Sequence, residues 1–245
     1  MLDDLMLMSK NDIPFEEAQI AIHPPTIREI GLIGEEAFYT GCELLTFSKD
    51  ILTEEDRNNL ETQTDFDVLM SIMTDKRQTA LLKNKVSALM VLALIFPKYS
   101  IEMTPREIQL IQEGEVHSIN SNNFEKFKEI LNAMFCLKGD SENSQNYNPG
   151  GDLARQIAEK FKKRQAIVAK QKGPQKIAVL VRYVSILAVG LKKDMNVLLD
   201  YTVYQIFDEM KRFELNEAHE LDIRFRLAGA KDLKEIDNWK KDIHP

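Results

Sequence analysis

Apolar residues recur at helical spacing along most of the chain and predict a series of α-helices. The first helix follows the break at His23-Pro24-Pro25, because Thr26 and Glu29 form a capping box at the start of an apolar periodic stretch over residues 26–45. Thr53 and the acids after it predict the start of a short helix. The same spacing predicts further helices over residues 66–73, 76–96, 121–135, 195–199 and 202–228, with an apolar core segment over 177–189.

Strand-like alternation is confined to two short stretches. Residues 108–112 and 116–119 flank the turn formers Glu113-Gly114 and predict a small hairpin. Residues 18–22 could form one further short strand in an otherwise irregular N-terminal stretch. We therefore expect a mainly α fold with about eight helices and at most one small β-hairpin.

A change in composition divides the chain into three parts. Residues 139–151 are poor in apolar side chains and rich in turn formers, which is typical of a linker. We expect an N-terminal helical domain over residues 1–138. A flexible linker with a basic amphipathic segment should follow over 139–176, and then a C-terminal helical region over 177–245 that packs on the N-terminal part.

Composition excludes several classes of protein. The 245 residues are 44% hydrophobic and carry a net charge of −7, which suits a globular chain and argues against a general nucleic-acid binder. The longest uncharged run, residues 86–97, is shorter than the roughly 20 residues of a membrane span. Cys42 and Cys136 form no CxxC motif. We expect a cytoplasmic protein with no nucleic-acid or membrane partner.

Catalytic motifs are absent from the sequence. It contains no HExxH, no phosphate-binding GxxxxGK[ST] and no GxSxG, and its four histidines show no spacing typical of a metal site. The acidic pairs are most simply helix caps and solvated faces. We expect no enzymatic activity, no catalytic residues, no metal site and no cofactor.

The basic segment is the strongest charge asymmetry in the chain. Residues 150–176 hold eight Lys and Arg against two acids. A narrow apolar stripe at i, i+4 and i+8 could pack on the acidic body of the same chain, dock on an acidic partner, or contact nucleic acid or an anionic membrane. Its candidate partner-binding residues are Leu153, Arg155, Ile157, Phe161, Lys162, Lys163 and Arg164.

The C-terminal stretch supplies two more candidates. The long helix should carry its apolar face through Leu221 and Phe225, and Gly229 should end it. Trp239, the only tryptophan, either packs the tail onto the body or belongs to a docking surface. Phe225 and Trp239 are therefore further candidate partner-binding residues.

Four stretches carry a resemblance to a known family. They are HPPTIREIGLIGEEAF at residues 23–38, IAEKFKKRQ at 157–165, TVYQIFDEMKRF at 202–213, and DIRFRLAGAKD from residue 222 with the NW that follows it. Together they resemble the tail assembly chaperones of long-tailed Firmicute phages and prophages. These motifs consist of helix caps and packing residues and carry no chemistry of their own.

The resemblance implies a role in assembly. Such a chaperone binds the tape-measure protein and keeps it soluble in the host cytoplasm before the tail tube polymerises, with the tail tube protein as a second partner. The alternative is a structural tail or baseplate component of the virion. A regulator that binds nucleic acid through residues 152–176 is a third hypothesis, and it predicts an affinity that falls steeply with salt.

Overall fold

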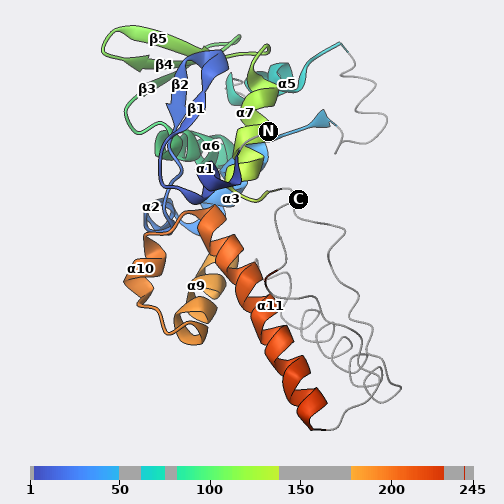
Figure 1. Cartoon of the computed structure of the whole chain (residues 1–245). Coiled ribbons are helices and arrows are strands. Elements are labelled where there is room, and N and C mark those ends of the chain that lie inside the picture. Colours follow the sequence, from blue (N-terminus) through green and yellow to red (C-terminus); the bar gives the residue numbers. More distant parts are fainter. Residues whose placement is uncertain (1–2, 50–61, 75–81, 138–177, 229–239, 241–245) are drawn as a thin grey trace. The chain divides into compact units, whose positions relative to one another are not determined.

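The computed structural model describes residues 3–49, 62–74, 82–137, 178–228 and 240. The chain divides into two compact units (Figure 1). The N-terminal unit consists of residues 1–138 together with 194–206, and the C-terminal unit consists of residues 139–193 together with 207–245.

The N-terminal unit begins with a short helix and a two-stranded antiparallel sheet that the sequence did not predict in full. The elements are α1 (Asp4–Met8), β1 (Ile13–Phe15), the 3-10 helix η1 (Glu16–Ala18) and β2 (Ile20–Ile22). Ile13 pairs with Ile22, and both side chains are fully buried. A strand of three residues that contains Pro14 is too short to show alternation, so the sequence pattern missed β1.

Two helices replace the single one expected over residues 26–45. They are α2 (Ile27–Ile33) and α3 (Glu35–Leu45). The predicted capping box is confirmed, because the Thr26 side chain accepts the Glu29 N–H and the Glu29 carboxylate accepts the Thr26 N–H. Gly34 separates the helices with φ of 86°, a conformation that costs glycine little and breaks the helical hydrogen-bond series.

Two further helices, α5 (Asp65–Thr74) and α6 (Leu82–Ile95), lie where the apolar spacing placed helices. The α3 and α6 backbones meet closely at Gly41. A Cβ built there would lie 2.7 Å from Val91 Cγ2, and closer still to the carbonyl oxygen of Ser87. Only glycine fits at this crossing without displacing α6.

The remaining described strands form a second sheet. It is antiparallel with the order β3-β4-β5, formed by β3 (Ser100–Met103), β4 (Ile108–Gln112) and β5 (Glu115–Ile119), and Figure 1 shows it beside the β1–β2 hairpin. His117 on β5 ties the two together, since its Nδ1 lies 3.2 Å from the carbonyl oxygen of Ala18. The β4–β5 hairpin was predicted, and β3 was not.

The expected fold class is therefore wrong. The described residues contain nine α-helices and two antiparallel sheets of two and three strands, so the chain is mostly helical with some sheet. The limit of one β-hairpin failed because β1, β2 and β3 have only three or four residues each.

An aromatic cluster around α7 (Phe124–Met134) forms the core of the N-terminal unit. The Phe127 ring centroid lies 6.1 Å from that of Phe15 and 6.2 Å from that of Phe96. The Phe124 ring centroid lies 5.1 Å from that of Phe66, with the two rings tilted by 59°. This cluster joins the first sheet to α5, α6 and α7, and the aromatic contacts add to the free energy gained by burial.

A segment from the far end of the sequence completes this unit. It contains α10 (Met195–Leu199), capped by Asp194 as predicted, and the first turn of α11 (Val203–Leu227). The Ile27 N–H donates to the carbonyl oxygen of Tyr201 at 2.8 Å, and Arg28 Nε donates to Asp200 at 2.8 Å. Leu198 and Ile206 are fully buried, so the segment is part of the core.

The described part of the C-terminal unit is a helix pair. It comprises α9 (Val179–Gly190) and α11 from residue 207 onward. The helices approach at Gly190, where a Cβ would lie 2.5 Å from the Phe213 ring, and Lys193 Nζ contacts Glu209 Oε1 at 2.6 Å. The predicted linker and basic segment over 139–176, the helix start at Thr53 and the helix stop at Gly229 lie outside the described residues.

Candidate functional site

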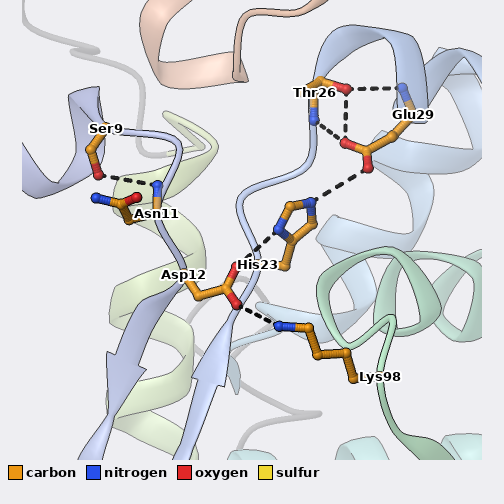
Figure 2. A network of polar contacts seen from close by, with 7 residues as sticks. All are labelled: Ser9, Asn11, Asp12, His23, Thr26, Glu29 and Lys98. Carbon is orange, nitrogen blue, oxygen red and sulfur yellow. Dashed lines mark hydrogen bonds and ion pairs between the residues drawn. The ribbon is translucent and has the colours of Figure 1, made fainter.

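The N-terminal unit contains a network of polar and titratable side chains around His23 (Figure 2). His23 Nδ1 lies 3.0 Å from Asp12 Oδ1, and His23 Nε2 lies 3.5 Å from Glu29 Oε1. Asp12 also contacts Lys98 Nζ at 3.3 Å. The network thus joins the loop before β1, the loop after β2, the start of α2 and the loop after α6.

The charges of the network are stabilised by their partners. Burial raises the pKa of Asp12, but hydrogen bonds from His23 and Lys98 outweigh burial and hold that pKa below its usual range. Burial likewise raises the pKa of Glu29. Hydrogen bonds from the Thr26 N–H and hydroxyl outweigh this effect, so the pKa of Glu29 is lowered overall. Both carboxylates therefore stabilise the fold above pH about 4, and this contribution is lost as the pH falls through their lowered pKa values.

This geometry suits a structural clamp better than a catalytic centre. A histidine that acts as a general base needs one free ring nitrogen facing a hydroxyl, a thiol or water. In the described chain each ring nitrogen of His23 faces a carboxylate, and neither is hydrogen-bonded to a hydroxyl or a thiol. The second oxygen of Glu29 is held by the Thr26 cap, at 2.7 Å from the Thr26 nitrogen.

Thr26→Ala should lower the free energy of unfolding by about 1 kcal/mol, because it removes the N-cap of α2 and one anchor of Glu29. Thr26→Ser keeps the accepting hydroxyl and should leave stability nearly unchanged. Urea unfolding of both variants checks this. Equal losses for alanine and serine would show that the methyl group, and not the cap, stabilises this position.

A second polar cluster lies between α5 and α7, where Lys128 and Asp65 are largely buried and Glu125 is 72% exposed. Lys128 Nζ lies 2.7 Å from Asp65 Oδ2 and 2.8 Å from Glu125 Oε1, and its side chain is only 8% exposed. Asp65 also accepts the backbone N–H of Lys49 at 3.1 Å. Burial alone would raise the pKa of Asp65, but these hydrogen bonds lower it. Every charge in the cluster has a partner, so the cluster functions as a cross-link in the core.

The part of the chain that the structure describes contains no assembled site for metal binding or for thiol catalysis. No group of three His, Cys, Asp or Glu side chains there could hold a metal ion. Neither Cys42 nor Cys136 forms a disulfide in the described structure. Burial raises the pKa of the Cys42 thiol, which disfavours the nucleophilic thiolate.

The end of α11 presents a different kind of surface. Residues 220–227, here called the α11 end segment, alternate charged and apolar side chains in the order ELDIRFRL. At 100° per residue, Leu221 and Phe225 lie on one side of the helix, and Ile223 and Leu227 lie about 200° away. All four are exposed, from 43% for Ile223 to 83% for Leu227. Apolar ridges on two sides cannot both pack against a single neighbouring surface.

Charged side chains of the α11 end segment form ion pairs along the helix. Arg224 contacts Glu220 at 3.3 Å and Arg226 contacts Asp222 at 2.7 Å, each at i, i+4 spacing. Such pairs stabilise the helix without covering the apolar ridges.

The predicted partner-binding residues fall mostly outside the described chain. Phe225 is described and is 55% exposed, whereas Trp239 and the seven candidates of the basic segment are not described. Leu221 was expected to continue the apolar face of α11, and the structure adds that its side chain is half exposed. Ile223 and Leu227 were missed, although the alternation ELDIRFRL inside a helical stretch was the signal that could have indicated them.

No described helix has the length and apolar character needed to cross a lipid bilayer.

Comparison with known proteins adds one similarity. Residues 170–244 match a family model described as the YomV second domain. The match indicates a phage-related family. No curated protein matches the chain, and no solved structure does. The α11 end segment lies within the matched residues.

Proposed function

We propose that this chain is a non-catalytic phage tail assembly chaperone that binds the tape-measure protein in the host cytoplasm and keeps it soluble before the tail tube polymerises. The phage-related match supports the setting. The observation that carries the proposal is the α11 end segment, where four large apolar side chains are exposed on two sides of one helix.

Exposed ridges of this kind suit an apolar helical partner. An amphipathic helix binds a second helix through side chains at i and i+4, as Leu221 and Phe225 are placed here. The tape-measure proteins that are bound by the tail assembly chaperones, the family this chain resembles, are long, helical and apolar. Asp222 is buried, but Glu220, Arg224 and Arg226 are exposed between the ridges and would keep the complex hydrated while the apolar side chains cover the partner.

Replacing both Leu221 and Phe225 by Glu should weaken binding of the tape-measure protein at least tenfold. A tenfold loss corresponds to about 1.4 kcal/mol of binding free energy. Co-expression of the two proteins, followed by measurement of the soluble tape-measure fraction, checks this. Val116→Glu is the matched control, because Val116 is 59% exposed on β5, in the N-terminal unit. It should leave solubilisation unchanged.

Two results would contradict the proposal. The tape-measure protein could remain equally insoluble with and without the parent chain, which would remove the chaperone function. Mass spectrometry of purified particles could instead find the chain in a fixed copy number, which would favour the structural tail or baseplate component. A chaperone should be scarce in finished particles.

A further inference from the structure

One side of α11 is less exposed than its neighbours over residues 214–222. Four buried or half-buried residues recur there at i, i+3, i+4 and i+7, which places them on the same side of the helix. They are Leu215, Ala218, His219 and Asp222, here called the Asp222 face. Glu214, Glu217 and Leu221 lie on other sides and are exposed.

The carboxylate of Asp222 lacks a donor for one of its two oxygens. Asp222 is 8% exposed, and its Oδ2 pairs with Arg226 at 2.7 Å. Its Oδ1 is buried and has no hydrogen-bond partner among the described residues. A buried carboxylate oxygen is costly to leave without a donor, so this atom indicates a missing one. A cationic side chain suits it best, because hydrogen bonds between ionised groups are the strongest.

The contacts of α9 with α11 lie earlier along the helix. Tyr183 packs on Phe207 with the ring centroids 5.2 Å apart, and Gly190 approaches Phe213. Asp222 follows Phe213 by nine residues, or about 14 Å of helix at 1.5 Å rise per residue. Figure 1 shows α11 running on past α9. The donor for Asp222 is therefore left to another segment.

The basic segment of the same chain has the complementary charge. Residues 150–176 hold eight Lys and Arg against two acids, whereas residues 208–222 of α11 hold six acids against two Lys and Arg. Both stretches belong to the C-terminal unit. Opposite charge on two segments of one unit favours contact between them.

The position of Arg164 matches that of Asp222. The apolar spacing of the basic segment predicts a helix with Leu153, Ile157 and Phe161 on one stripe. Arg164 follows Phe161 at i+3 and Ile157 at i+7, so it lies within that stripe, whereas Lys162 lies off it. One cation among apolar residues can thus meet one carboxylate on the Asp222 face.

We propose that residues 152–168 of the basic segment dock as a helix on the Asp222 face and that Arg164 supplies the donor to Asp222 Oδ1. The connections of the chain allow this contact. Arg164 precedes Ala178, at the start of α9, by 14 residues, which span up to about 46 Å when extended. The part of α11 from Phe207 to Asp222 is only about 22 Å long.

The tether also explains how a small face holds its occupant. Docking within one chain proceeds at a high effective concentration, so a short stripe suffices where two separate molecules would need a larger interface. The docked segment keeps its basic side chains against the protein's own acidic helix and away from nucleic acid and membranes. This inference does not depend on the proposed function, because it concerns contacts within one chain only.

Hydrogen–deuterium exchange of the full chain tests the docking. In the parent chain, the amides of residues 153–168 should exchange on the order of tenfold more slowly than those of an unstructured chain. Arg164→Glu should remove most of this protection. Lys162→Glu is the matched control, because it makes the same change of charge off the stripe, and it should leave the protection nearly unchanged.

A charge swap tests the pair. Asp222→Arg should remove the protection of residues 153–168, and combining it with Arg164→Asp should restore much of it. Asp222→Asn keeps the side-chain volume, and it should reduce this protection while the amides of α9 stay protected. Loss of protection in α9 as well would overturn the proposal, because Asp222 would then serve the fold of the unit.

Four further results would overturn the proposal. They are an unprotected segment in the parent chain, equal losses for Arg164→Glu and Lys162→Glu, no recovery in the swapped variant, and protection that appears only when DNA is added. Protection that disappears on about hundredfold dilution would also overturn it, because that result assigns the Asp222 face to a second copy of the chain.

Discussion

Gly41→Ala should destabilise the N-terminal unit by roughly 3 kcal/mol, within the range for overpacking a tight core. The new Cβ would lie 2.7 Å from Val91 Cγ2 and closer still to the carbonyl of Ser87. The backbone of α6 cannot rotate away as a flexible side chain can, so the two helices must separate. Separation would loosen the packing around Val91, Leu92 and Ile95, which are fully buried.

Gly31→Ala is the matched control for that substitution. Gly31 lies inside α2, and a Cβ added there would meet nothing within 4 Å. Alanine should therefore fit and stabilise the unit by about 0.5–1 kcal/mol through lower backbone entropy in the unfolded chain. Thermal and urea unfolding of both variants give the comparison. If both glycines respond alike, helix propensity decides the outcome and the α3–α6 contact does not.

Lys128→Met should cost about 3–5 kcal/mol, the range for breaking a buried ion pair by removing one partner. The substitution keeps most of the side-chain volume and leaves the Asp65 carboxylate, 14% exposed, without its cation. Lys126→Met is the control, because the same change on the same helix removes an exposed pair with Glu129. It should alter stability little. Urea unfolding at pH 7 measures both.

The pH dependence of the difference between parent and Lys128→Met tests the cause. Asp65 has a lowered pKa in the parent, so its contribution is fully present above the unfolded pKa of about 3.9 and is lost as the pH falls through the folded value. For Lys128, burial lowers the pKa but hydrogen bonds to Asp65 and Glu125 outweigh it and raise it. Its contribution therefore persists until pH rises above about 10.4. The difference should be constant between about pH 5 and 10 and shrink in acid. A difference that persists undiminished below pH 3 would assign the loss to packing of the lysine stem.

The sequence indicated the helices and their caps better than the strands. Thr26, Asp194 and Thr202 were each predicted to start a helix, and each does, because a cap is a local signal that its own neighbours complete. The break at Gly34 was missed, since a helical stretch tolerates an isolated glycine and only tertiary packing decides whether the chain turns there. Strands of three or four residues carry too few positions for alternation to be recognised.

The candidate site was harder to predict from the sequence than the helices. Lys98 lies 86 residues from Asp12 along the chain, and only the fold brings it to Asp12 and His23. The exposure of Val86 and Leu89 on α6 was also hidden, because a run of apolar residues looks the same whether one face or both are covered. Phe225 was named for its place in an apolar stripe, and the structure adds that its side chain is exposed and that Ile223 and Leu227 are exposed on the other side of the helix.

The position of the segment over residues 194–206 has a consequence for synthesis. This segment contributes Leu198, Val203 and Ile206 to the core of the N-terminal unit, and it hydrogen-bonds the start of α2. A ribosome therefore finishes the first 137 residues roughly 3 to 14 s before it adds residue 206, at about 5–20 residues per second. During that interval the nascent N-terminal unit lacks part of its own core. Its apolar surface around Ile27 and Ile30 would be open to cellular chaperones, and a truncation placed before residue 194 would leave it open permanently.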